Sequence, residues 1–344
     1  QSPLRKTLPE ELRAFLPPNI VVEVDKNGYI KRVTDKFVNE RLDLAEKIAR
    51  QRSIVSQYNM IVKNVKSDLR SPDEITRLAA LVTAIIMETG IRPGKAGNAA
   101  IKTVDGEKIE VETFGAITLG PAHVRFVKNN FAELEFVGKK GGVNTASLSD
   151  TGIIKVLQDY VDKAQKGGSK FIFLTADGTR FSYSDLQRYF RSHFKGISPT
   201  DFRKLRATQA MLAKIRGEQE ALYEDIRGFI QDQGGDLRER IIGALVGVLD
   251  DALEAAQVAL SHDSPTTTRD AYINPNIILQ FLSTGRAAQT LEAAMMDSRT
   301  QLTFDPMTFV QIAGSMAVAA AWVKQSADVT LRELLEQLEE DLDL

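Results

Sequence analysis

The chain has 344 residues, of which 43% are hydrophobic and 26% charged, a composition that fits a folded protein of two or three domains. It contains no cysteine, which excludes disulfides, thiolate catalysis and cysteine-based metal sites. The net charge of -2 is spread unevenly: residues 1–70 hold 14 basic and 9 acidic residues, whereas residues 273–344 hold 4 and 10. A basic body with an acidic end is compatible with a polyanionic partner, but an ordinary solvated charged face would give the same balance.

The N-terminal part predicts an irregular arm, a hairpin and a helix. Residues 1–18 are rich in proline and are expected to be irregular. Residues 21–30 predict a short β-hairpin, because the Asn27-Gly28 pair supplies the positive φ angles of a tight turn. Apolar residues then follow helical spacing from Asn39 to Lys66.

A second helix is expected to be buried, since it is apolar on nearly all sides from Leu78 to Met87. Ser71 is expected to cap this helix and Pro72 to occupy its first position. We expect the helix to end at Gly90.

A β-hairpin with two lysines at its tip is predicted next. Apolar and polar residues alternate from Phe131 to Val137, and a second strand-like run extends from Val143 to Leu148. The glycine-rich segment between them, residues 138–142, allows the chain to reverse. Lys139 and Lys140 then lie at the tip.

The rest of the chain is predicted to be mostly helical. Helix caps are expected at Ser149-Asp150 and at Ser182 to Asp185. Residues 217–240 are polar and charged and predict either a linker or a helical insertion. The three histidines, His123, His193 and His262, do not have the spacing of metal ligands, so no catalytic metal is expected.

Five motifs in one order resemble the type IB DNA topoisomerases, in particular the small forms of poxviruses and bacteria. The motifs are Thr89–Lys95, Thr113–Leu119 followed by His123, Leu134–Lys139, Thr200–Arg203 and His262–Tyr272. The resemblance covers roughly residues 70–285. Each motif alone is weak, whereas their joint order is specific.

The resemblance implies an α+β, mainly α fold. Its centre is a helical catalytic domain, like that of type IB topoisomerases and tyrosine recombinases, with a small β-sheet. A short basic N-terminal segment with a β-hairpin, residues 1–70, would be a reduced DNA-clamp domain. Residues 71–285 would form the catalytic domain. Residues 286–344 fall outside the resemblance, and their own sequence predicts an acidic, helical C-terminal extension.

The implied activity is relaxation of supercoiled double-stranded DNA through a transient 3′-phosphotyrosyl link, without ATP, metal or another cofactor. DNA is the expected partner. Because the first residues lack the apolar core of a signal peptide, we expect an intracellular protein, located with the DNA in a nucleoid, cytoplasm, viral factory or virion.

Five residues would perform the reaction, by the family's pattern. Tyr272 would attack the phosphorus, and Arg92, Arg203 and His262 would bind the non-bridging oxygens, where charge develops. Lys139 would protonate the departing 5′-oxygen. Additional DNA contacts are expected from a set of basic residues: Lys95, Lys140, Lys204, Arg206 and Arg269.

Alternatives stay open for three of these roles. Arg206 lies one helical turn after Arg203, and Lys140 directly follows Lys139. Tyr183 and Tyr189 are the alternatives to Tyr272. His123 is expected to be structural, and His193 to lie on the surface.

The chain departs from the family pattern in three places. The interval from His262 to Tyr272 is one residue longer than usual, so either the loop carrying Tyr272 bulges or the nucleophile sits differently. Thr200 stands where the family commonly has a lysine. The N-terminal segment before Arg92 is short.

Two alternative functions stay open. The protein could be a tyrosine recombinase or telomere resolvase, or a DNA-binding module that has lost its activity.

The C-terminal extension contains two hydrophobic patterns. Residues 307–323 form an apolar run that is too short and too weakly apolar for a membrane span, so a buried or oligomer-forming helix is favoured. Residues 330–342 predict an acidic amphipathic helix with a leucine stripe. Self-association or binding of a protein partner is therefore expected of this extension.

Overall fold

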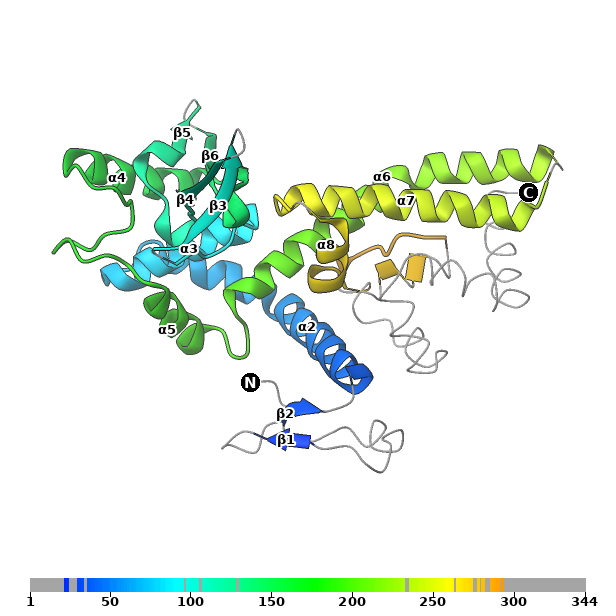
Figure 1. Ribbon diagram of the computed structural model, residues 1–344, viewed down its shortest axis with the longest axis horizontal. Coiled ribbons are helices and arrows are strands. Elements are labelled where there is room, and N and C mark those ends of the chain that lie inside the picture. The colour runs from blue at the N-terminus through cyan, green and yellow to red at the C-terminus, as the bar shows by residue number, and fades with distance from the viewer. Residues whose placement is uncertain are drawn as a thin grey trace. The chain divides into compact units, whose positions relative to one another are not determined.

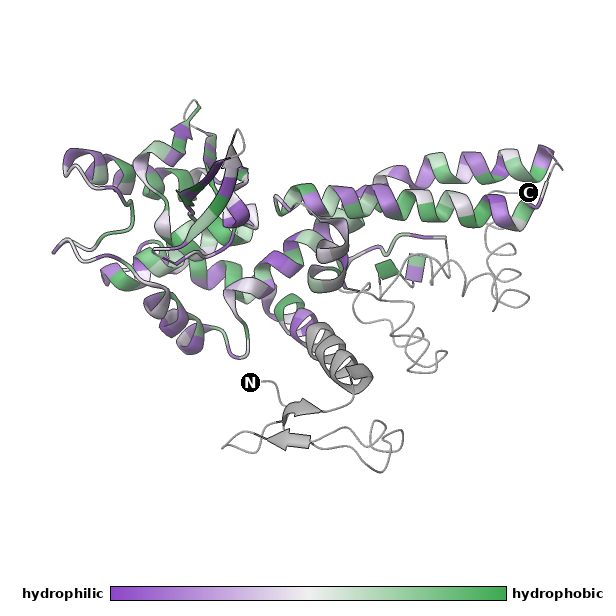
Figure 2. Ribbon diagram, viewed as in Figure 1, coloured by the Kyte–Doolittle hydropathy of each residue, from purple (hydrophilic) through white to green (hydrophobic). Residues whose placement is uncertain are grey.

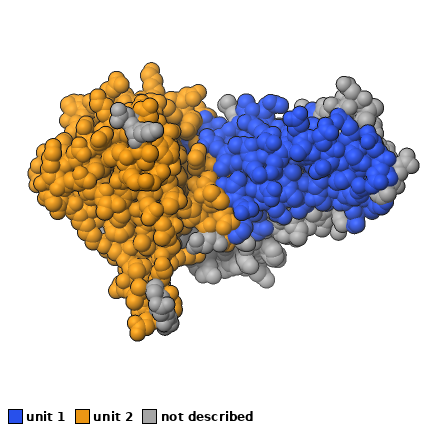
Figure 3. All heavy atoms as spheres, turned by 90° about the horizontal axis from the view of Figure 1, so that it is seen from above, with its two compact units in different colours: residues 1–55, 208–256, 265–344 blue, residues 56–207, 257–264 orange. Residues whose placement is uncertain are grey.

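The computed structural model describes residues 22–24, 30–33 and 36–293, except residues 96, 105–106, 128–129, 233–234, 263, 275–276, 279, 282–284 and 292. The side chains of residues 22–24, 30–33, 36–49, 104, 238, 266 and 270 are also not described. The chain divides into two compact units (Figure 3): unit 1 comprises residues 1–55, 208–256 and 265–344, and unit 2 residues 56–207 and 257–264. Three helices contribute to both units: α2 (Lys36–Asp68), α6 (Pro199–Asp232) and α7 (Leu237–Ala259) (Figure 1).

The core of unit 2 is built on helix α3 (Glu74–Thr89). Every residue from Leu78 to Ile86 is buried, as the apolar sequence predicts. The helix ends at Gly90, whose φ of 71° is the left-handed conformation that favours glycine. The expected start was wrong: Asp73 is the cap, because its carboxylate accepts a hydrogen bond from Thr76 N (2.8 Å).

Two antiparallel sheets of unit 2 follow α3 in sequence. Strands β3 (Ala99–Val104) and β4 (Glu107–Glu112) form a two-stranded ribbon. Strands β5 (Val124–Phe126), β6 (Ala132–Val137) and β7 (Val143–Leu148) form a three-stranded sheet in that order. Two 3-10 turns, η2 (Ala116–Thr118) and η3 (Pro121–His123), lie between the sheets along the chain.

The predicted hairpin with the lysine tip is confirmed. Strand β6 pairs with β7 from Ala132↔Leu148 to Val137↔Val143. Alternate residues of β6 are buried, as the sequence pattern requires. The lysine tip, residues 138–142, includes the 3-10 turn η4 (Lys139–Gly141), in which Lys140 and Gly141 have φ angles of 70° and 81°.

Helices α4 (Thr151–Lys166) and α5 (Tyr183–His193) complete unit 2, and both begin at predicted caps. Asp150 accepts hydrogen bonds from Gly152 N (2.9 Å) and Ile153 N (3.2 Å). Ser182 and Asp185 form a reciprocal capping box.

Unit 1 contains the longer parts of two amphipathic helices, α6 and α7. The parts of α6 and α7 that belong to it show alternating hydrophilic and hydrophobic bands (Figure 2). Their buried residues recur at helical spacing: Met211, Leu212, Ile215, Leu222 and Ile226 on α6, and Ile241, Ile242, Leu245, Leu249 and Leu253 on α7. Of the described part of residues 217–240, all but residues 235 and 236 are helical, as the second of the two alternatives requires.

Helix α8 (Pro265–Tyr272) also belongs to unit 1. After it, the backbone of Ala287 and Ala288 is fixed to α6: Gln219 accepts from Ala287 N (2.7 Å), and Arg216 donates to Ala288 O (2.6 and 2.9 Å). None of the described helices is long and apolar enough to cross a membrane.

The mainly α fold with small antiparallel sheets is confirmed. The N-terminal hairpin is also present, as β1 (Val22–Val24) pairs with β2 (Ile30–Val33). The expected Asn-Gly turn, the proline-rich arm, the apolar run and the acidic helix lie outside the described residues. The three predicted domains, residues 1–70, 71–285 and 286–344, stay predictions.

Candidate active site

Two arginines of unit 2 converge on one histidine. Arg92 Nη2 lies 3.4 Å and Arg203 Nη2 3.2 Å from Nε2 of His262. A guanidinium can only donate, so these contacts are hydrogen bonds in the tautomer whose Nε2 accepts and whose ring proton is on Nδ1. The N–H groups of Arg92 and Arg203 that point at Nε2 can also donate hydrogen bonds to the oxygen of a bound anion.

Arg92 follows α3 directly and is held by backbone hydrogen bonds. Ala116 N donates to Arg92 O and Ile117 N to Pro93 O, both at 2.8 Å. Gly115 makes this approach possible, since a Cβ on it would lie 2.6 Å from Arg92 O. The Thr113–Leu119 motif, here called the bridging segment, therefore positions Arg92.

The bridging segment also connects to the strand that leads to Lys139. Phe114 N donates to Val137 O (2.7 Å), at the end of β6. Lys139 comes two residues after Val137. The segment that holds Arg92 therefore also fixes the end of the strand that leads to Lys139. The sequence identified this motif by resemblance alone, and the hydrogen bonds explain its placement between the two catalytic candidates.

Arg203 is buried, with 3% of its surface exposed, on the first turns of α6. Its Nε donates to Gly90 O (2.5 Å), which directs the rest of the guanidinium toward His262. Ser198 and Asp201 fix the helix start, because the Asp201 carboxylate accepts from Ser198 N (2.9 Å) and Oγ (2.7 Å). A buried arginine such as Arg203 needs hydrogen-bond acceptors such as Gly90 O, since removing its charge from water is costly.

His262 follows the end of α7 and is held through its backbone. Its N–H donates to Gln257 O (3.1 Å), and its carbonyl accepts from Gln257 Nε2 (2.9 Å). The preceding Ser261, with φ of 49°, turns the chain and donates to Thr145 O (3.3 Å) of β7. The imidazole is half-buried.

A cavity of about 430 Å³ in unit 2 opens beside Arg92. Its cationic lining residues are Arg92, Lys95, Lys139 and Lys140. Tyr183 and Thr200 also line it, and Lys95 Nζ lies 5.2 Å from the centre of the Tyr183 ring. Lys139 and Lys140 are both exposed. The cavity therefore combines cations with an opening large enough for a phosphate and its neighbours.

Two other predicted DNA contacts lie on α6 near Arg203. Lys204 is paired with the buried Asp201 (3.3 Å), whereas Arg206 is exposed. Arg203 is the arginine that reaches His262, which favours it over Arg206 for the phosphate.

Tyr272 and Arg269 lie on α8, which belongs to unit 1. Tyr272 is the last residue of the helix and is 9% exposed, so it is carried by a helix and not by a loop, and of the two alternatives the different position of the nucleophile is favoured. Its carbonyl accepts from Gln51 Nε2 (2.9 Å) and Thr208 Oγ1 (3.5 Å). Gln51, fully buried on α2, is a residue that no sequence signal identified.

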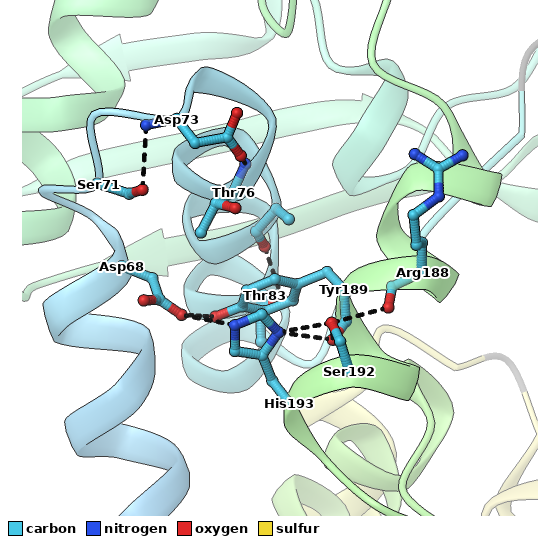
Figure 4. A network of polar contacts seen from close by, with 10 residues as sticks. Asp68, Ser71, Asp73, Thr76, Thr83, Arg188, Tyr189, Ser192 and His193 are labelled. Carbon is cyan, nitrogen blue, oxygen red and sulfur yellow. Dashed lines mark hydrogen bonds and ion pairs between the residues drawn. The ribbon is translucent and has the colours of Figure 1, made fainter.

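Tyr189, an alternative nucleophile, is engaged in a polar network (Figure 4). Its hydroxyl donates to Asp68 Oδ2 (2.7 Å), and its ring stacks on His193 at 4.3 Å. Burial, together with the Asp68 carboxylate, raises the pKa of Tyr189 well above its usual value. Forming a phenolate there is unfavourable, which argues against Tyr189 as the nucleophile.

The other two histidines have structural contacts. His123 accepts from Gly120 N through Nδ1 (2.9 Å) and packs edge-on against Phe114 (4.3 Å). Burial lowers its pKa. His193 was expected on the surface but contributes to the network of Figure 4, with Nε2 3.6 Å from Asp68.

A family model for the catalytic core of eukaryotic DNA topoisomerase I matches residues 41–260. The match covers well over half of the chain, and the chain belongs to this family, as its motifs predict. The matched part contains Arg92, Lys139 and Arg203 and ends two residues before His262.

No curated protein matches the chain. Among solved structures, the chain is similar to the XerH site-specific recombinase bound to a palindromic difH substrate in a post-cleavage complex. The identity is 13% and the TM-score 0.36, over 66% of this chain and 47% of the recombinase chain. The chain thus spans about half the length of that recombinase.

Proposed function

We propose that the protein relaxes supercoiled double-stranded DNA by cutting and resealing one strand, without ATP or metal. The observation that carries this proposal is the convergence of Arg92 and Arg203 on His262, next to a cavity lined by Lys139. Membership of the topoisomerase family supports the same conclusion.

Cleavage would proceed by transfer of one phosphodiester bond. The Tyr272 oxygen attacks the phosphorus, a new P–O bond forms, and the bond to the 5′-oxygen breaks. The phenolic proton leaves to solvent or a base, and the 5′-oxygen takes a proton from Lys139. The 3′-phosphotyrosyl link stores the bond energy while the free strand rotates. Religation is the reverse reaction and needs no ATP.

The two guanidiniums would stabilise charge on the non-bridging oxygens in the transition state. Arginine suits this role because it remains charged and donates in a fixed plane. Fixing Arg203 through Gly90 and Arg92 through the bridging segment avoids a reorganisation cost at the moment of reaction. His262 can donate from Nε2 only once that nitrogen carries a proton and no longer accepts from the arginines.

Plasmid relaxation tests the proposal directly. The protein is incubated with positively or negatively supercoiled plasmid in EDTA without ATP. We expect relaxation of both. A strict requirement for magnesium, or no relaxation, would refute the proposal, and recombination between paired sites without free relaxation would favour a recombinase.

A modified substrate tests the role of Lys139. In DNA with a 5′-bridging phosphorothiolate, the leaving sulfur needs little protonation. Lys139→Ala should cleave ordinary DNA slowly and the modified DNA at nearly the wild-type rate, whereas Arg203→Ala should be slow on both. Equal defects of Lys139→Ala on both substrates would transfer the acid role elsewhere, and rescue of Lys140→Ala would assign it to Lys140.

DNA is the proposed partner, and the protein is proposed to be located with DNA inside the cell or virion. For the C-terminal extension we propose competition with DNA or contact with a second subunit or protein, from its excess of acidic residues. A chain ending at Val329 should then bind duplex more tightly at low salt, with a difference that shrinks as salt rises. An unchanged affinity and salt dependence in the folded truncated protein would contradict competition with DNA.

A further inference from the structure

The lysine tip contacts a second β-structure of unit 2. A Cβ on Gly141 would lie 3.5 Å from Val111 Cγ2, 3.6 Å from Lys102 Cβ and 3.8 Å from Ala100 Cβ. These three residues lie on one face of the β3–β4 ribbon, because Ala100 pairs with Val111 and side chains of a strand alternate. Gly141 is buried, although Lys139 and Lys140 beside it are exposed.

The outer part of the ribbon is exposed, whereas Glu112 at the end of β4 forms an ion pair with Lys170. Its described side chains are exposed from Ile101 to Thr103 and from Glu107 to Ile109, and Ile101 is 70% exposed. Ala100 and Val111, the pair that faces Gly141, are half-buried. The half-buried part of the ribbon is therefore the part that lies against the lysine tip.

The base of the ribbon is tied to the bridging segment. Asn98 O accepts from both Thr113 N (2.9 Å) and Thr113 Oγ1 (3.1 Å). Asn98 and Ala99 also line the cavity together with Lys139. The ribbon thus rises from the rim of the cavity, anchored next to the segment that holds Arg92.

The lysine tip needs an external support to be ordered. Three of its five residues, at positions 138, 141 and 142, are glycine, which loses more conformational freedom on ordering than any other residue. Within the tip, Gly141 N donates to Gly138 O (3.0 Å), and Gly138 N to Gly142 O (2.7 Å). A general acid must stay close to its leaving group, so the proposed role of Lys139 requires an ordered tip.

We propose that the β3–β4 ribbon is a positioning arm for Lys139: Ala100 and Val111 clamp Gly141 and hold the lysine tip at the cavity. Lys139 then delivers its proton from a fixed place and not from a freely swinging loop. Ala100 and Val111 are positioning residues, since they act through the tip. This inference rests on the proposed function for its catalytic consequence, but not for the clamp itself.

The double variant Ala100→Gly/Val111→Ala removes two of the three side-chain contacts to Gly141 and leaves that of Lys102. Ile101→Ala is the matched control, because it truncates an aliphatic side chain on the opposite face of the same ribbon. Thermal unfolding of both variants establishes that they fold.

The first measurement is independent of DNA. The chain contains no cysteine, so Lys140→Cys introduces a single site for a nitroxide spin label. The label should move faster in the double variant than in the parent protein or the Ile101→Ala control. Unchanged label mobility would overturn the clamp, whether or not the protein acts on DNA.

The second measurement is the rate of DNA cleavage. The double variant should cleave ordinary DNA about 10- to 100-fold more slowly, a loss expected from a displaced proton donor. It should recover most of this loss on 5′-bridging phosphorothiolate DNA, while Ile101→Ala cleaves both substrates at the parent rate. Equal loss on both substrates would overturn the positioning role. If the parent protein cleaves neither substrate, the proposed function fails and the label alone decides the clamp.

Discussion

Gly115→Ala is a sharp test of how the bridging segment holds Arg92. The φ of Gly115 is -162°, an extended conformation that any residue adopts, so the cost of alanine is purely steric. Its Cβ would lie 2.6 Å from Arg92 O and 2.7 Å from N and Cα of Gly94. All three are backbone atoms and cannot rotate away.

The size of the effect follows from these distances. Ordinary van der Waals contact begins at 3.4 Å, so Arg92 O must move by about 0.8 Å relative to Gly115. This movement strains the 2.8 Å hydrogen bonds from Ala116 N and Ile117 N. Overpacking of this kind costs about 1–3 kcal/mol of the free energy of unfolding. A misplacement of about 1 Å at a reacting centre lowers the rate by about 100-fold.

The assays are denaturant unfolding and DNA cleavage, measured at a temperature where the Gly115→Ala variant and the parent protein are both folded. Gly167→Ala is the control, because its φ is -85° and its nearest contact would be an ordinary 3.4 Å. The control should change the free energy of unfolding by less than about 0.5 kcal/mol. If Gly115→Ala unfolds and cleaves DNA like the parent protein, the close packing of this segment on Arg92 is refuted.

Three further predictions concern the nucleophile and the pH dependence of stability. Tyr272→Phe should abolish the covalent adduct with DNA, seen by denaturing gel, and leave affinity nearly unchanged, because phosphate contacts supply affinity. Asp150→Ala should lower the free energy of unfolding by about 1 kcal/mol through loss of the α4 cap. Burial alone would raise the pKa of Asp150, but Lys66 and two backbone N–H groups lower it below the usual 3.8, so the difference from the parent should shrink as the pH falls below that value. Tyr189 has a raised pKa, from burial first and then from Asp68, so its contribution is full below pH 10 and is lost at higher pH. Tyr189→Phe should therefore be less stable than the parent at neutral pH but less sensitive to alkali in pH-dependent unfolding.

Each of these predictions has a clear contrary result. An adduct formed by Tyr272→Phe would assign the nucleophile to another tyrosine, with Tyr183 at the cavity as the first candidate. A constant difference between Asp150→Ala and the parent at acidic pH would show that the carboxylate charge does not stabilise the cap. Parallel alkaline unfolding of Tyr189→Phe and the parent would remove Tyr189 from the titrating groups.

Local structure could be predicted where neighbouring residues decide it. The burial of α3, the hairpin around the lysine tip and the caps at Asp150 and Ser182 depend on periodicity and turn chemistry within a few residues. The start of α3 was harder, since both Ser71 and Asp73 are good caps. Only the backbone conformation determines that Asp73 caps and that Ser71 Oγ accepts from Asp73 N.

The motifs also identified the family, but not the reason for their spacing. The resemblance identified Arg92, Arg203 and His262 from their residue types and from the order of their motifs along the chain. Their meeting at one imidazole nitrogen joins positions 170 and 59 residues apart, which no local pattern encodes. It depends on Gly90 O receiving Arg203 and on the turn at Ser261, both products of packing.

Two features were decided by tertiary structure alone. Tyr272 lies at the end of a helix instead of in a bulged loop, with its carbonyl bound by Gln51 from a helix 221 residues earlier in the chain. The sequence motifs do not single out the β3–β4 ribbon, and only its packing on Gly141 relates it to Lys139. Sequence determined which side chains are available and which local elements form, because those depend on near neighbours. The fold decided which of them meet, because contacts between distant segments depend on how the whole core packs.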